Sequence, residues 1–332
     1  MLRRTVPLAI LLALLVALPT VAETAGRGWW TGVATNILIF ALAAGSLNLI
    51  LGFGGLVSFG HAAFFGTGAY VVGILGFHAD RGTPVVTWPV ELPGTYQALI
   101  AWPLAMLAAG LLALLIGLVC LRTRGLYFIM ITLAFAQMIY FFFVGLEAYG
   151  GDDGLSLWQR SELPGLDLGD DVQFYYLVLA LAVAAFALKQ RVVDSRFGVA
   201  LRGARDNDRR MRALGFDTQR TRLAAFTLAG AVAGLAGALI ANQTEFVSPS
   251  FLAWQRSGEL LIMVILGGIG SILGPALGAA AFLLLEEVLA AWTEHWMIVL
   301  GPLLLLVVLF AKRGLWGLLE RPLGTRAEVP RD

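Results

Sequence analysis

The chain has 332 residues, 59% of them hydrophobic and 14% charged, and its formal net charge at pH 7 is +1. This balance gives no strongly basic surface, so the sequence predicts no nucleic-acid partner. The single cysteine, Cys120, excludes an intramolecular disulfide, and the scattered histidines lack the paired spacing of a metal site. Neither lysine stands in a G-x-x-x-x-G-K-[ST] motif, so we expect no ATP site, no cofactor and no enzymatic chemistry on this chain.

The first apolar run, residues 6–21, follows Arg3 and Arg4. A basic start before a short apolar core is typical of a cleaved signal peptide, and equally of a first membrane helix with a cytoplasmic N-terminus. We favour the retained helix, because no clear A-x-A site precedes Glu23 and many further apolar runs follow.

Apolar runs recur along the rest of the chain. About 20 apolar residues cross a bilayer as a helix, and these runs lack the alternation of barrel strands. With the first run they predict about ten transmembrane helices, the others at 32–51, 61–77, 97–121, 125–146, 172–190, 222–241, 258–273, 275–292 and 296–311. The predicted fold is all-α and polytopic, with one membrane-spanning domain over residues 1–332.

Basic residues predict the orientation of these helices, because cytoplasmic loops are enriched in lysine and arginine. If the N-terminus is cytoplasmic, then Arg122, Arg124, the arginine-rich residues 192–222 and the basic residues after 311 all fall inside. Residues 147–171 fall outside, with seven acids and one base. Both termini are therefore expected in the cytoplasm.

Three outer segments are longer than a turn, at 78–96, 147–171 and 242–257. The first contains three prolines and is expected to be extended rather than helical. Together these segments form either a docking face for an outer partner or simple connections between helices.

Residues 192–222, here named the basic segment, predict two short amphipathic helices. Apolar residues recur at helical spacing with arginines on the other faces, Asp206 or Asn207 caps the second helix, and Gly215 ends it. Contact with anionic lipid is the alternative to a cytoplasmic partner, but lipid does not explain the acidic centre at 206–208. The candidate docking residues are Arg196, Ala200, Leu201, Arg205, Asp206, Asn207, Met211, Leu214 and Gly215.

Two glycine clusters, at 52–60 and 267–275, interrupt apolar runs. Residues 51–66 (LGFGGLVSFGHAAFFG) resemble 266–280 (LGGIGSILGPALGAA), which indicates a weak internal repeat with broken helices; chance among abundant glycines is the alternative. The glycines either open the backbone to a zwitterionic solute or let helices pack closely.

Polar residues inside the predicted helices are the other candidates for a translocation pathway, although helix–helix hydrogen bonds and interfacial positions explain them too. With the glycines, the candidate pathway residues are Asn48, Gly54, Ser58, His61, Gln137, Gly268 and Glu286.

Several stretches resemble LivM-type permeases of the branched-chain, or hydrophobic, amino acid ABC importers. They are GLVSFGHAAFFGTGAY (55–70), RGLYFIMITLAFAQM (124–138), GGDDGLSL (150–157) and 246–279, in that order, and 196–215 resembles the cytoplasmic coupling loop of ABC-importer permeases. The resemblance covers nearly the whole chain. GGDDG at 150–154 differs from the GG-x-NG of other members, including urea-type permeases, and favours amino acids over urea.

The resemblance implies a multi-pass subunit of the bacterial cytoplasmic (inner) membrane that moves solute without covalent chemistry. Its implied partners are a second, LivH-type permease, two cytoplasmic ATPase subunits that hold ATP and Mg, a periplasmic substrate-binding protein, and membrane lipid. One alternative is an ABC permease for urea, short amides or related small solutes. Another, of a different class, is a secondary transporter or channel, for which the few buried acids offer a poor ion relay.

Overall fold

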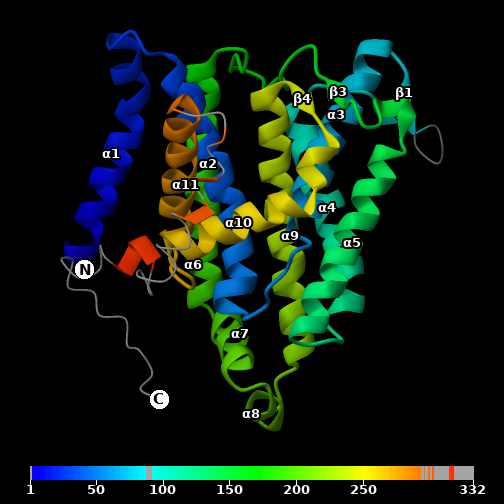
Figure 1. The fold of residues 1–332 in the computed structure, drawn as a ribbon, viewed down its shortest axis with the longest axis vertical. Helices are drawn as coiled ribbons and strands as arrows, with labels where there is room; N and C mark the ends of the chain where they lie inside the picture. The colour runs from blue at the N-terminus through cyan, green and yellow to red at the C-terminus, as the bar shows by residue number, and fades with distance from the viewer. Residues whose placement is uncertain are drawn as a thin grey trace.

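The computed structural model describes residues 2–86, 92–292, 295, 298–299, 301–302 and 314–317. Long helices run roughly parallel and form one bundle (Figure 1). The α-helices are α1 (Leu2–Thr24), α2 (Trp29–Asn48), α3 (His61–Arg81), α4 (Ala98–Cys120), α5 (Leu126–Val144), α6 (Asp171–Asp194), α7 (Arg196–Asp206), α8 (Asp208–Ala213), α9 (Thr218–Thr244), α10 (Trp254–Gly267) and α11 (Gly274–Trp292).

Shorter elements connect them. One π-helical turn, η1 (Leu49–Phe53), continues α2, and two 3₁₀ turns lie at η2 (Glu147–Tyr149) and η3 (Pro249–Leu252). Two small antiparallel sheets pair β1 (Pro84–Val86) with β2 (Leu92–Pro93) and β3 (Leu155–Ser156) with β4 (Phe246–Val247).

Within the described residues, seven helices are long and apolar enough to cross a membrane. This confirms the predicted all-α, polytopic fold, although not the number of ten. In α1 an apolar helical stretch covers Leu11–Thr24, and the expected span at 296–311 lies almost wholly outside the described residues.

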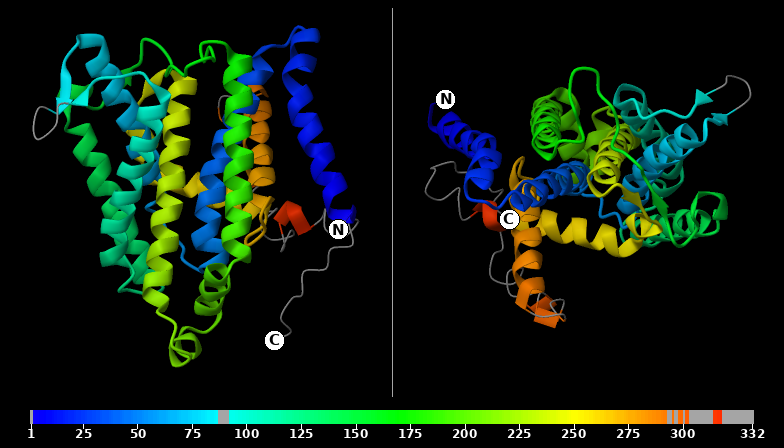
Figure 2. Two further views of the ribbon diagram at one scale, coloured as in Figure 1. Left: turned by 180° about the vertical axis from the view of Figure 1, so that it is seen from behind. Right: turned by 90° about the horizontal axis from the view of Figure 1, so that it is seen from above.

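The predicted span at 258–273 is wrong. The helix there, α10, has 14 residues, ends at Gly267, and lies across the long helices instead of along them (Figures 1 and 2). Gly268 and Gly270 have φ of +121° and +76°, a backbone region that glycine tolerates and a helix cannot use. The apolar composition of the run carries no information about this break or about the direction of the helix.

The segments rich in basic residues lie together at one end of the bundle, as the sequence predicts. The turn between α4 and α5, the start of α1 and helices α7 and α8 lie at one end, and both small sheets lie at the other (Figures 1 and 2). At the end with the small sheets, α3 extends to Arg81, so residues 78–81 are helical where the sequence predicts extended chain. Ion pairs join the loops at this end: Arg160 pairs with Asp171 at 2.7 Å and with Glu245 at 3.3 Å.

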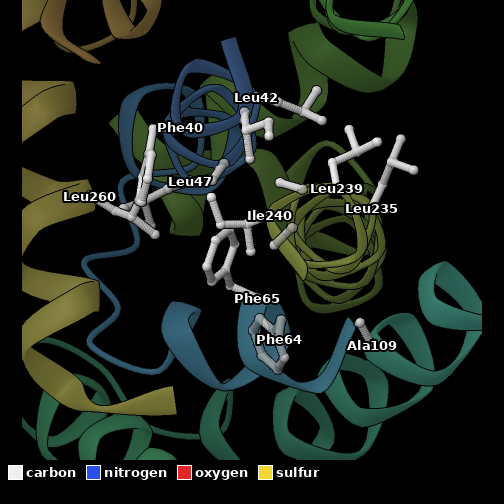
Figure 3. Packing of buried hydrophobic residues seen from close by; sticks show 14 of the residues in the cluster. Phe40, Leu42, Leu47, Phe64, Phe65, Ala109, Leu235, Leu239, Ile240 and Leu260 are labelled. Carbon is white, nitrogen blue, oxygen red and sulfur yellow. The ribbon is translucent and has the colours of Figure 1, made fainter. Parts of the chain in front are cut away.

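Helix α9 lies at the centre of the bundle and contacts α2, α3 and α4. Its small residues allow this, since a Cβ added at Gly234 would meet the Cβ of Ala109, and one at Gly237 would meet the carbonyl oxygen of Phe65. Bulky side chains fill the spaces between the same helices (Figure 3): Phe40, Leu42, Leu47, Phe64, Phe65, Leu235, Leu239 and Ile240.

Candidate functional site: the basic segment and the glycine junction

The basic segment forms the two helices that the sequence predicts, α7 and α8. Ser195 caps α7, with its Oγ 3.4 Å from the amide nitrogen of Gly198. Of the two predicted caps for α8, Asn207 takes the role: its backbone is extended and its Oδ1 accepts a hydrogen bond from the Arg210 amide at 2.9 Å. Gly215 follows α8 with φ of +87°, as a helix-ending glycine requires.

The apolar face of α7 packs on the chain's own bundle. Leu201 is fully buried, Ala200 and Ala204 are buried beside it, and a Cβ added at Gly54 would lie 3.4 Å from Cδ1 of Leu201. Met211 packs against Gly203 and joins α8 to α7. The basic segment is therefore held to the membrane-spanning helices by α7.

The opposite side of the basic segment is left exposed. It carries Arg196, Asp206, Asn207 and Gly215, and also Leu214, whose exposed fraction is 67%. Arg205 is exposed as well, but it follows Leu201 by one helical turn and its guanidinium reaches the bundle. Two further apolar side chains lie exposed there, Val199 and Phe216. The sequence interpretation did not identify either residue. The pattern that could have found them is a large apolar residue with arginines on both sides in an otherwise polar stretch.

Asp208 fastens the basic segment to two other parts of the chain. Its carboxylate contacts Arg124 in the α4–α5 turn at 2.6 Å and Arg212 at 3.3 Å, and lies 3.6 Å from Arg222 on α9. Burial alone would raise the pKa of Asp208. A hydrogen bond from Thr218 and the three guanidinium groups outweigh that effect and hold the pKa below its ordinary value.

Arg205 connects the basic segment to the first glycine cluster. Its Nη1 donates to the carbonyl oxygen of Gly52 at 2.6 Å, and its stem would be 2.6 Å from a Cβ at Gly55. Since η1 is a π-helical turn, its carbonyl groups depart from the usual helix pattern and can be reached by a side chain.

The first glycine cluster in turn contacts the second. Asn48 donates from Nδ2 to the Ser271 carbonyl at 2.6 Å and accepts at Oδ1 from the Gly270 amide at 3.0 Å. A Cβ at Gly52 would lie 2.8 Å from Cα of Gly270, so the two backbones touch. We name this contact between residues 48–55 and 267–274 the glycine junction.

Side chains of this chain occupy the backbone groups that the glycine breaks set free. Lys189 of α6 donates to the Ile272 carbonyl at 3.1 Å, in addition to the bonds made by Asn48 and Arg205. The sequence interpretation offered the amides and carbonyls of the breaks to a solute; the Gly52, Ser271 and Ile272 carbonyls and the Gly270 amide are already paired with side chains of this chain. Close packing is also present, since a Cβ at Gly278 would meet the Met263 carbonyl. The cavity beside Ser46 and Lys189 has a volume of about 30 Å³, which holds about one water molecule.

The other candidate pathway residues differ in burial and in their place in the fold. His61 is buried at the start of α3 with its Nε2 2.7 Å from Oγ of Ser46, and the next amide, of Ala62, donates to Ser257 of α10 at 2.8 Å. Ser58 is buried and accepts from the Gly60 amide. Gly268 ends α10 within the junction. By contrast, Gln137 lies half-buried on α5, and Glu286 on α11.

Seven helices long and apolar enough to cross a membrane define a multi-pass membrane protein, with an arginine-rich helical pair built into one end. The family model "Branched-chain amino acid transport system / permease component" matches residues 30–308, and the chain belongs to this family. It is therefore a membrane component of a transport system and not an enzyme.

Individual relatives agree. The chain is 30% identical to the high-affinity branched-chain amino acid transport system permease protein LivM of Escherichia coli K12, over 93% of this chain and 74% of the relative. It is 29% identical to LivM of Salmonella typhimurium, over 85% and 69%. The LivH permease of E. coli is 29% identical over 43% of this chain and 46% of its own length. No solved structure matches the chain.

Proposed function

We propose that this chain is one of two membrane-spanning subunits of an ATP-driven importer for branched-chain or other hydrophobic amino acids in the bacterial cytoplasmic membrane. The family and the LivM relatives support the substrate class. The observation that carries the coupling role is the construction of the basic segment: one face of α7 is packed on the bundle, and the other leaves arginines and apolar side chains exposed.

In this proposal, two cytoplasmic ATPase subunits bind ATP and Mg and contact the exposed face of the basic segment. Val199, Leu214 and Phe216 supply apolar contacts, and the surrounding arginines supply charge. A LivH-type permease is the second membrane subunit, which is consistent with the partial similarity of this chain to LivH.

Movement of the ATPase subunits would then reach the membrane helices through two contacts of α7. Leu201 packs beside Gly54, and Arg205 donates a hydrogen bond to the carbonyl oxygen of Gly52. Beyond them, Asn48 ties the end of α2 to the break between α10 and α11. A displacement of α7 therefore acts on the glycine junction. The junction in turn acts on α2 and on α10, which cross each other in the bundle.

The outer end of the bundle is the proposed docking face for a periplasmic substrate-binding protein. Trp158 is 85% exposed there, and the adjacent loop presents several acids to solvent. Arg160 fixes this loop to α6 and to the end of α9, so the face is preorganised.

Competition transport tests the proposed substrate class. Uptake of radiolabelled leucine by cells carrying the complete system should be inhibited by unlabelled isoleucine and valine and unaffected by urea or acetamide. Inhibition by urea or acetamide without inhibition by isoleucine and valine would contradict the assignment.

A further inference from the structure

Helix α10 carries an ion pair that lies against the middle of α2, a helix long and apolar enough to cross a membrane. Nη1 of Arg256 contacts Oε2 of Glu259 at 2.6 Å, and the guanidinium carbon of Arg256 lies 5.5 Å from the ring centroid of Phe40. Phe40 is residue 12 of the 25 in the candidate span Trp29–Phe53, so this contact lies beside the middle of that span. Figure 3 shows Phe40 of α2 and Leu260 of α10 in the same buried cluster.

The described residues do not enclose this ion pair. The side chains of Arg256 and Glu259 retain exposed fractions of 27% and 33%. The carboxylate of Glu286 on α11 lies within electrostatic range of both, so acids outnumber bases in the patch. Ionisable groups at this depth are costly against lipid and are found facing protein or water. The outer side of α10 is therefore covered by something other than acyl chains.

The same side of α10 has the form of a helix contact surface. Gln255, Gly258, Glu259 and Ile262 recur at the spacing of one helical face and are half-buried or exposed, while Ser257, Leu260 and Leu261 face the core. A Cβ added at Gly258 meets no atom within 4 Å, so nothing in the described residues requires a glycine there. A glycine on an outer face at membrane depth lets another helix approach closely.

We propose that this face of α10, formed by Gln255, Arg256, Gly258, Glu259 and Ile262, is the contact surface for the second permease subunit. The inference rests on the proposed importer, in which two related permeases stand side by side. In Figure 2, seen from above, α10 lies at the edge of the bundle, where another bundle can reach it. The partner face should offer a cation or hydrogen-bond donors opposite Glu259 and Glu286.

A photo-crosslinker tests the contact in the intact complex. A benzophenone amino acid is placed at Gln255 of α10 and, as a control, at Leu111, which is 58% exposed on the apolar surface of α4. The expected result is an adduct with the second permease from position 255 and none from 111. Adducts with lipid alone, with a second copy of this chain, or with the second permease only from position 111 would overturn the proposal.

A bulky substitution gives an independent test. Gly258→Trp should lower co-purification of the second permease at least about tenfold, a loss of about 1.4 kcal/mol in association, while the amount of this chain in the membrane stays at the parent level. Leu111→Trp should leave both unchanged. Full co-purification of Gly258→Trp would overturn the α10 contact. If no second permease co-purifies even with the parent chain, the importer proposal itself fails, which separates the two outcomes.

Discussion

Arg205 on α7 donates a hydrogen bond from Nη1 to the carbonyl oxygen of Gly52 at 2.6 Å, and so joins the basic segment to the end of a buried candidate membrane span. The two residues are 153 positions apart in the sequence. This bond and the packing of Leu201 on Gly54 are the routes by which the basic segment touches the glycine junction.

Substitution of Arg205 by alanine should uncouple the importer. A hydrogen bond from a charged group contributes about 1.5–3 kcal/mol, so uptake should fall at least about fivefold while ATP hydrolysis by the assembled complex continues. Arg202→Ala is the matched control, because Arg202 lies on the same helix without a hydrogen bond or ion pair among the described residues. Equal ratios of uptake to hydrolysis in the two variants would argue against the role of Arg205.

Asn48 should tolerate neither alanine nor aspartate. Alanine leaves the Gly270 amide and the Ser271 carbonyl unpaired, at about 1–3 kcal/mol for each buried group. Aspartate can still accept from Gly270 but cannot donate to Ser271, so it restores only one bond. We expect both variants to lower the thermal unfolding temperature of the purified complex. Parent-like unfolding of Asn48→Asp would show that the bond to Ser271 is unimportant.

Asp208 predicts a specific pH dependence. Because its folded-state pKa lies below the unfolded value of about 3.9, its contribution to stability is present above that pH and is lost as the pH falls through the folded-state pKa. The parent should therefore unfold at a higher temperature than Asp208→Asn at pH 6–7, and this difference should shrink below about pH 4. A difference that stays constant down to pH 3 would contradict the ion-pair account.

Accessibility labelling checks the predicted sidedness. In a Cys120→Ala background, a cysteine replacing the exposed Trp158 should react with an impermeant maleimide added outside the cell, and one replacing Arg209 on α8 only after permeabilisation. Trp158 follows β3 closely in the chain and Arg209 is part of α8, and these two elements lie at opposite ends of the bundle (Figure 1). Labelling of both from the same side would invalidate the orientation.

Local chemistry made the basic segment predictable from its sequence. Asn207 stops one helix and caps the next through its own side chain, and Gly215 supplies the φ that ends the second. Apolar length likewise predicts most membrane-crossing helices, because each needs only its own residues to satisfy its backbone.

The direction of α10 through the bundle and the contacts between segments far apart in the sequence could not be predicted in the same way. The apolar run at 258–273 looks like a span, yet α10 crosses the bundle, since the glycines after Leu266 break it and it packs on the distant helices α2 and α3 as well as on its neighbour α11. Asn48 and Ser271 are 223 positions apart. Nothing local in either segment indicates that a buried amide on one will satisfy the backbone of the other.

The ATP dependence of transport tests the central claim most directly. The measurement is leucine uptake into proteoliposomes that contain both permeases, with the binding protein outside and ATP inside, in the presence of either active ATPase subunits or subunits lacking their phosphate-binding lysine. The account predicts uptake with the active subunits and none with the inactive ones. Uptake that is driven by an ion gradient, with inactive ATPase subunits, would contradict it.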